Sequence, residues 1–235
     1  MIQKTLRFIR SPLLHVQGAY FFYKMKKLPD PVGDLQGQVG QGKPLKVLMV
    51  GDSSALGVGC ERIEQTAIGG VIQQLSELYQ VHYQVCAFTG FSTLKVFEQV
   101  QKIPAQNFDY VIVSLGSNDI VEGTQHELWQ SHNNALFRHI EHKLRPKKVL
   151  ISAIPPFEKL QTVPKRMRTF LSVKSRQMNQ HLIQYSLQHH RFEYVDLDFD
   201  FRPDYISADG FHPSSVLYRL QGQRLAERLL EFQGY

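Results

Sequence analysis

The chain has 235 residues, 43% hydrophobic and 20% charged, which is the composition of a soluble globular protein and excludes low-complexity and collagen-like chains. Its length fits one α/β domain with a sizeable core and room for an appendage. Two cysteines, Cys60 and Cys86, make no disulfide framework for a chain this long and lack metal-ligand spacing, so we interpret them as small buried hydrophobic residues.

The formal net charge of +6 comes from the N-terminal segment. Residues 1–29 hold six lysines and arginines and no acidic residue, so basic and acidic residues are equal in number in the rest. The segment is also rich in aliphatic and aromatic residues, and Ser11-Pro12 is a plausible helix start. His15 and Gln17 interrupt its apolar run, which argues against a secretory signal, and no stretch reaches the ~20 apolar residues of a spanning helix. We therefore predict a basic amphipathic arm at 1–29.

The sequence favours neither of two roles for this arm. A basic, aromatic helix could lie on an anionic membrane surface, or it could pack against its own domain or a partner subunit. The expected localisation is cytoplasmic, at the membrane surface if the first role holds. Prolines and glycines are frequent just after the arm, which predicts a linker at 30–44 and the main domain at 45–235.

Five short apolar runs in the main domain are predicted strands, and segments of helical length separate them. The expected strands are 46–50, 83–87, 110–115, 148–153 and 193–197. The expected helices lie near 65–79, 92–101, 126–144, 168–190 and 214–232. Strands that alternate with helices predict a parallel sheet with helices on both faces, joined by right-handed crossovers. We expect an α/β fold, a three-layer α/β/α sandwich with a five-stranded parallel sheet in flavodoxin-like order.

Small polar residues follow several of these strands. The first strand ends in Gly51-Asp52-Ser53, and open α/β sheets bind ligands in the crevice at this end of their strands. Ser53 is therefore a candidate nucleophile, with a turn or helix-capping serine as the alternative. Later strand exits carry Gly90, Asn118 and an Asp-x-x-His pair, Asp209 and His212. Because these residues converge on one edge of the sheet, we favour the interpretation of Ser53 as a nucleophile.

Each of these residues has a chemical role that fits the others. His212 can take the proton of the weakly nucleophilic serine, and Asp209 can hold the other ring nitrogen. The Ser53 and Gly90 N–H groups and the Asn118 amide are candidate donors to an oxyanion. The alternatives are a turn or capping carboxylate for Asp209, a turn glycine for Gly90 and a helix N-cap for Asn118. Asp52 and Asp119 we interpret as caps or turn ligands.

Four blocks of the chain resemble the SGNH hydrolases, also called the GDSL esterase/lipase family. They are Gly51-Asp52-Ser53, Gly90, Gly116-Ser117-Asn118-Asp119 and Asp209-Gly210-Phe211-His212-Pro213, in a resemblance that spans 45–232. It implies that Ser53 is the nucleophile, His212 the base and Asp209 its orienting acid, with an oxyanion hole formed by Ser53, Gly90 and Asn118. Ser54 stands where leucine is commoner in the family, which leaves the triad intact but alters the pocket wall.

The resemblance implies a serine hydrolase that cleaves carboxylic esters through an acyl-serine intermediate, of carboxylesterase or lysophospholipase type. The expected substrate is a small-molecule or lipid ester, with no cofactor, no metal and no nucleic-acid partner. The sequence gives no indication of the oligomeric state. An acyltransferase or deacetylase on the same site is the alternative, followed by a non-catalytic binding module. Segment 159–191 has seven basic residues and no acidic one, and is either a solvated helix face or a basic rim beside the site.

Overall fold

The structure is a computed structural model that describes residues 18, 20–21, 23–197, 199–200 and 202–232. Most of the predicted arm at 1–29 lies outside the described residues, and its role therefore stays a prediction. Phe21, which is described, packs against one of the two apolar clusters of the main domain. Within the described part of the chain, no helix combines the length and the apolar character needed to cross a membrane.

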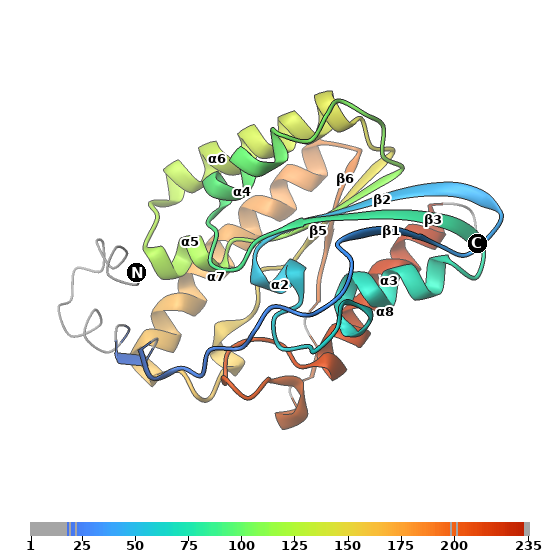
Figure 1. Cartoon of the computed structure of the whole chain (residues 1–235). Helices are drawn as coiled ribbons and strands as arrows, with labels where there is room; N and C mark the ends of the chain where they lie inside the picture. Colours follow the sequence, from blue (N-terminus) through green and yellow to red (C-terminus); the bar gives the residue numbers. More distant parts are fainter. Residues whose placement is uncertain (1–17, 19, 22, 198, 201, 233–235) are drawn as a thin grey trace.

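The described residues form one sheet of six strands in the order β1-β3-β2-β4-β5-β6 (Figure 1). The strands are β1 (Gln36–Val39), β2 (Lys43–Gly51), β3 (Tyr79–Ala87), β4 (Tyr110–Ser114), β5 (Lys148–Ser152) and β6 (Phe192–Val195). Strands β2 to β6 are parallel and follow the predicted flavodoxin-like order. β1 is antiparallel to β3 and corrects the expected five strands to six.

β1 lies inside the segment predicted as a linker, 30–44. All four of its residues are exposed, so no alternation of apolar and polar side chains marks it as a strand. Its register with β3 runs from Gln36 opposite Gln84 to Val39 opposite Val81. Part of the expected linker is thus an edge strand of the sheet.

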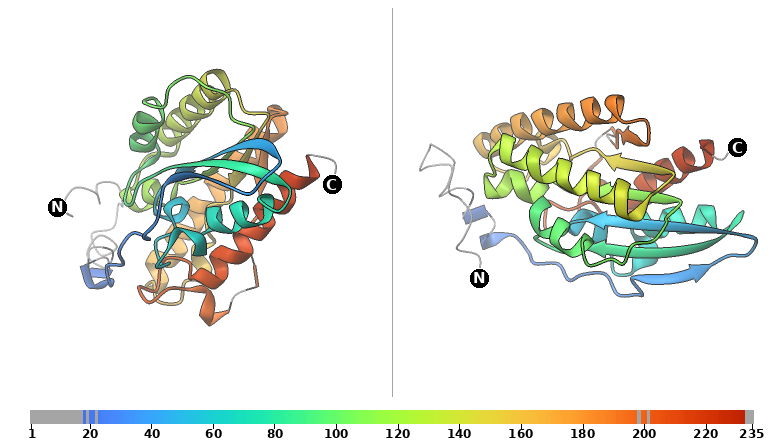
Figure 2. Two further views of the ribbon diagram at one scale, coloured as in Figure 1. Left: turned by 45° about the vertical axis from the view of Figure 1, so that its right-hand side comes forward. Right: turned by 90° about the horizontal axis from the view of Figure 1, so that it is seen from above.

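Helices cover both faces of the sheet, which gives the predicted three layers (Figures 1 and 2). One face carries α4 (Thr93–Val100), α6 (His126–His139) and α7 (Lys165–Gln188), which share an apolar cluster with that side of the sheet. The other face carries α3 (Ala67–Leu75) and α8 (Ser215–Glu231). Ile140–Leu144 continues α6 as a π-helix, and short 3₁₀ turns lie at Ile63–Gln65, Phe157–Lys159 and Pro203–Tyr205.

The central strands are apolar on both sides because both faces of the sheet are covered. In β2, Leu48 and Val50 join the cluster under α4, α6 and α7, while Val47 and Met49 join the cluster under α3 and α8. This alternation follows from the two-residue period of a strand. Buried on both faces, β2 reads as a continuous apolar run, which is why the sequence locates it.

Two short helices begin just after β2 and β4 end, and neither was predicted from the sequence. They are α2 (Ser53–Leu56) and α5 (Ser117–Glu122), each too short to show a helical period. β3 and β4 are the two neighbours of β2 in the sheet. The exits of these three strands therefore meet at one edge.

Candidate active site

Ser53 is the first residue of α2, directly after β2. Asp52 precedes it as the N-cap, with extended backbone and a side chain that accepts the Ser54 N–H at 2.9 Å. The helix ends at Gly57, whose φ of 94° is left-handed. Asp52 is thus a cap, as predicted, and the alternative in which Ser53 caps the helix does not hold. The Ser53 side chain is left to make other contacts.

Ser53, His212 and Asp209 form a continuous chain of contacts. The His212 Nε2 atom lies 2.9 Å from the Ser53 Oγ atom, and its Nδ1 atom lies 2.5 Å from Asp209 Oδ2. All three residues are buried, with between 8% and 9% of their surface exposed. The structure therefore brings together the three residues for which the sequence predicted the nucleophile, base and orienting acid.

Asp209 also shapes the turn that carries His212. Its Oδ1 atom accepts the backbone N–H groups of Phe211 and His212 at 2.9 and 3.0 Å. Gly210, which lies between Asp209 and Phe211, adopts a left-handed φ of 72°. A Cβ at this position would lie 2.6 Å from the side chain of Thr162. Burial opposes ionisation of Asp209, but the hydrogen bonds from His212 and the two N–H groups outweigh it and lower the pKa of this carboxyl. Asp209 is thus a turn carboxylate, as one interpretation held, and its other oxygen contacts His212.

Gly90 lies in a turn after β3 that is closed by the Phe91 N–H, which donates to the Phe88 carbonyl oxygen at 3.3 Å. Its φ is 78°, and a Cβ built on it would meet nothing within 4 Å. The conformation explains a glycine here, as the turn interpretation requires. The open space beside it also lets a ligand approach this turn.

Asn118 lies in the first turn of α5. Gly116 is the N-cap of that helix, so Asn118 is not a cap. Its Nδ2 atom donates to the carbonyl oxygen of Phe91 at 3.1 Å, which ties it to the Gly90 turn. A side-chain amide has two N–H groups, and one remains to be donated to a ligand. Gly90 and Asn118 thus lie after the two strands that flank β2.

One contact at this edge has no signal in the sequence. Asp30 Oδ1 accepts the hydroxyl hydrogen of Thr89 at 2.6 Å, although the two residues are 59 positions apart. This hydrogen bond joins the segment before β1 to the residue that precedes Gly90. Thr89 stands next to Gly90 in the second block of the resemblance, but nothing in the sequence pairs it with Asp30.

Two further carboxyl groups are buried near Ser53. Asp52 caps α2, and Asp119 Oδ2 accepts the N–H and the hydroxyl of Thr93 at 2.9 and 2.7 Å. Thr93 is the first residue of α4, so Asp119 binds the start of that helix. Burial raises the pKa of both carboxyls to about 6, against 3.8 for an ordinary aspartate.

These raised pKa values predict how stability changes with pH. Between about pH 4 and pH 6 the folded protein binds more protons at Asp52 and Asp119 than the unfolded chain does, so their contribution to stability falls as the pH rises. Asp119→Asn removes one of the two groups while keeping an acceptor for Thr93. From pH 7 to pH 5 the unfolding free energy of the variant should rise by about 1 kcal/mol less than that of the wild type.

Urea unfolding at pH 5, 6 and 7 measures this difference. Asp34→Asn, an exposed carboxyl in the segment before β1, is the matched control and should retain the wild-type pH dependence. Equal pH slopes for Asp119→Asn and the wild type would contradict the prediction.

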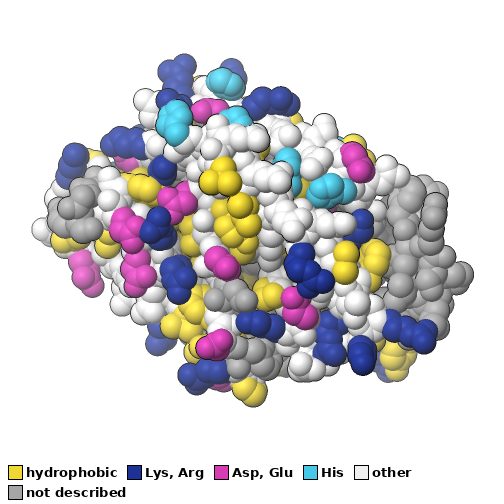
Figure 3. Space-filling model, turned by 180° about the vertical axis from the view of Figure 1, so that it is seen from behind, with side chains coloured by type: hydrophobic (Ala, Val, Ile, Leu, Met, Phe, Trp, Pro, Cys, Tyr) yellow, Lys and Arg dark blue, Asp and Glu magenta, His cyan; other side chains and the backbone are white. Residues whose placement is uncertain are grey.

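The basic segment 159–191 is mainly α7. Arg176 pairs with Glu158 at 3.0 Å, and the Lys159 ammonium donates to the Phe199 carbonyl oxygen at 2.8 Å. On the face shown in Figure 3, lysines and arginines are interspersed with acidic and histidine side chains. Two basic groups near the site are therefore engaged within the protein.

Comparison with known proteins gives one family match and several similar folds. The model of the GDSL-like lipase/acylhydrolase family matches residues 49–220. A search of the curated proteins finds no match to this sequence. A GDSL-family lipolytic protein of Veillonella parvula DSM 2008 is similar in structure, with a TM-score of 0.64, 16% identity and coverage of 78% of this chain and 97% of its own.

Two other solved structures are similar with somewhat lower TM-scores. The lipase/acylhydrolase of Enterococcus faecalis has a TM-score of 0.56 and 18% identity, covering 79% of this chain and 95% of its own. Esterase EstA of Pseudoalteromonas, in a structure inhibited by monoethylphosphonate, has a TM-score of 0.58 and 15% identity, covering 81% and 99%. At these identities the similarity establishes the fold.

Proposed function

This chain belongs to the GDSL-like lipase/acylhydrolase family, and we propose that it hydrolyses carboxylic esters through an acyl-Ser53 intermediate. The observation that carries the proposal is the 2.9 Å contact between Ser53 Oγ and His212 Nε2, with Asp209 on the other ring nitrogen. A serine hydroxyl becomes a useful nucleophile when a base is positioned to take its proton. This geometry supplies that base.

The proposed reaction has two halves. Ser53 Oγ attacks the ester carbonyl carbon as His212 Nε2 takes its proton, and Asp209 stabilises the imidazolium that forms. The tetrahedral intermediate expels the alkoxide, to which His212 returns the proton, leaving Ser53 acylated. Water then attacks the acyl-enzyme, with His212 as base, and the acid is released with Ser53 restored.

Three donors are proposed to bind the oxyanion. The Ser53 N–H is in the first turn of α2, where helix N–H groups have no partner within the helix. The Gly90 N–H and the second N–H of Asn118 come from the exits of the flanking strands, and the space beside Gly90 is open. Each such donor typically contributes a factor of about 10² to 10³ in kcat.

Ester hydrolysis and active-site labelling together test the proposal. The wild type should hydrolyse p-nitrophenyl acetate and gain one phosphonyl group from a fluorophosphonate, with the adduct on Ser53 by peptide mass spectrometry. A phosphonate probe is apt because the similar esterase EstA was solved inhibited by monoethylphosphonate. Ser53→Ala should lose both reactions, by about 10⁴-fold or more in kcat.

Ser54→Ala is the matched control for labelling, since it removes the adjacent serine and leaves Ser53 in place. It should label at the wild-type position. Equal turnover by the wild type and Ser53→Ala would refute the acyl-Ser53 mechanism, and failure of Ser53 to label would favour a non-catalytic binding module.

A further inference from the structure

A cavity of about 280 Å³ lies beside the contact between Ser53 and His212. His212 and Phe211 line one side, and Ser54 and Ser117 line another, next in sequence to the proposed nucleophile and to Asn118. The remaining walls come mainly from the loops after β5 and β6, with further residues from β4, α7 and α8, and include Phe157, Leu197, Phe199 and Leu217. The cavity therefore lies mainly on the β5–β6 side of the nucleophile and extends to the exit of β4.

The chemistry of ester cleavage indicates which portion of the substrate lies on this side of Ser53. His212 must return its proton to the departing alkoxide, so the alcohol oxygen has to come within hydrogen-bond reach of Nε2. The proposed oxyanion donors Gly90 and Asn118 follow β3 and β4, and neither is among the described residues that line the cavity, although it reaches Ser114 and Ser117 at the exit of β4. The alcohol portion thus extends toward His212 and the acyl portion away from it.

The lining also indicates which alcohol would fit. Aromatic and aliphatic side chains make up most of the wall, and the charged ones are of both signs. Glu158 and Arg176 form an ion pair at 3.0 Å, so neither selects a charged ligand by itself. The volume of about 280 Å³ is just below the range of about 300–1,000 Å³ that is usual for ligand pockets. A cavity of this size suits an alcohol with one or two rings better than a long alkyl chain.

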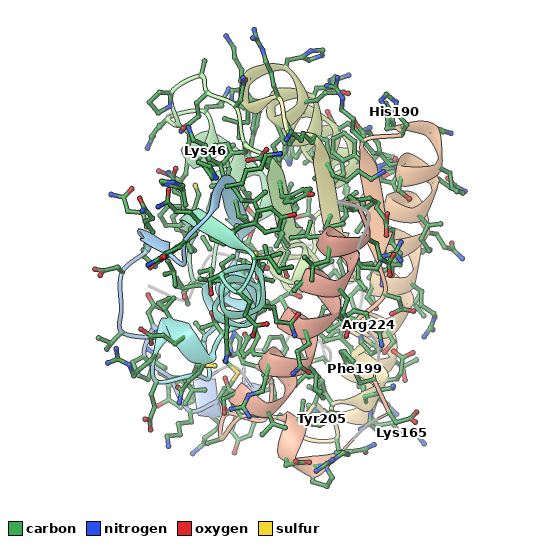
Figure 4. The ribbon with its side chains drawn as sticks, turned by 90° about the vertical axis from the view of Figure 1, so that its right-hand side faces the viewer. Lys46, Lys165, His190, Phe199, Tyr205 and Arg224 are labelled. Carbon is green, nitrogen blue, oxygen red and sulfur yellow. The ribbon has the colours of Figure 1, made fainter. Side chains whose placement is uncertain are left out.

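Resting on the proposed ester hydrolysis, we infer that this cavity binds the alcohol portion of the substrate, and that the substrate is an ester of a bulky, uncharged, mainly apolar alcohol. Ser54 contributes to the space, because a leucine at this wall position would occupy part of it. Phe199 and Tyr205, which line the cavity, are labelled in Figure 4 together with Arg224 of α8. The guanidinium carbon of Arg224 lies 5.2 Å from the centroid of the Phe199 ring.

Two filling variants test the assignment from different walls. Ser54→Leu fills the cavity from α2 and Leu217→Trp from the first turn of α8. Val216→Trp adds the same bulk at the preceding, exposed residue, which does not line the cavity, and is the matched control. Activity is measured on two ester series: acetates of ethanol, phenol and 2-naphthol, and ethyl esters with acyl chains of increasing length.

Both filling variants should lose at least tenfold in kcat/KM on 2-naphthyl acetate, mainly through KM, and change less than twofold on ethyl acetate. The ethyl-ester series should keep the wild-type dependence on acyl length, and Val216→Trp should match the wild type throughout. A loss that follows acyl length, or that is equal on all esters, would overturn the assignment.

A measurement on the wild type alone keeps the inference testable if the variants fold poorly. 2-Naphthol should inhibit hydrolysis of ethyl acetate competitively, and the inhibition should weaken at least tenfold in any filling variant that folds. Absence of inhibition in the wild type would overturn the assignment. Failure of the wild type to hydrolyse any ester would instead refute the proposed function, so the two failures are distinguishable.

Discussion

Replacing His212 by alanine is expected to lower kcat for p-nitrophenyl acetate by about 10⁴-fold or more. The imidazole is the one group within 2.9 Å of Ser53 Oγ that can take its proton, among the hydrogen bonds of the described residues. Without it the hydroxyl stays protonated near neutral pH, and the alkoxide has no acid to leave with. What activity remains would come from substrate binding and the oxyanion donors.

His190→Ala is the control for this variant. His190 is exposed and lies at the far end of the sheet from the site, just before β6 (Figure 4). It should retain wild-type kcat, and both variants should keep the wild-type circular dichroism spectrum. A kcat for His212→Ala within tenfold of the wild type would exclude His212 as the base.

Gly51→Ala is expected to destabilise the fold by about 3 kcal/mol or more. Gly51 is the last residue of β2 and pairs with Ser114 of β4 in the parallel register. A Cβ on Gly51 would lie 1.9 Å from the Ser114 carbonyl oxygen and 2.6 Å from the Cβ of Ala55. The first neighbour is backbone and the second is the Cβ of a residue in α2, so neither can rotate away from the added methyl group. The methyl group would have to separate the strand exits that position Ser53.

Urea unfolding at pH 7 measures the loss, with Gly37→Ala as the control. Gly37 is in the exposed edge strand β1, and the three atoms nearest to a Cβ there all belong to the end of the Tyr83 side chain, the closest at 2.9 Å. That ring can turn, so the control should change stability by less than about 1 kcal/mol. Equal unfolding free energies for Gly51→Ala and Gly37→Ala would contradict the prediction that the close approach of β2 and β4 excludes a side chain at Gly51.

The elements that the sequence predicted are those with a strong apolar pattern. Strands buried on both faces, such as β2 and β4, read as apolar runs, and the longer amphipathic helices show their period. β1 has four exposed residues, and α2 has only four residues in all, so neither carries such a pattern. β1 is fixed instead by its pairing with β3, and α2 by its Asp52 N-cap and by Gly57 at its end.

The site was predictable where residues sit directly at strand ends. Ser53, Gly90 and Asn118 follow strands that the sequence locates, and Asp209 and His212 are three residues apart in one turn. The supporting contacts were not predictable. Asp119 binds the start of α4 across 26 residues, and Asp30 binds Thr89 across 59, through hydroxyl and carboxyl groups that are common everywhere in proteins.

The hydrogen bond between Ser53 and His212 joins residues that are 159 positions apart. Ser53 follows the central strand β2, while His212 comes after β6, with β4 and β5 lying between these strands in the sheet. α8 closes this circuit from the other side, since the Tyr218 hydroxyl donates to the Val58 carbonyl oxygen at 3.1 Å. No fragment that stops short of residue 212 carries both groups, and partial assembly of the sheet leaves them apart. On the proposed mechanism, ester turnover therefore counts the molecules in which β2, β4, β5 and β6 are assembled, and a colorimetric assay would follow this step of refolding.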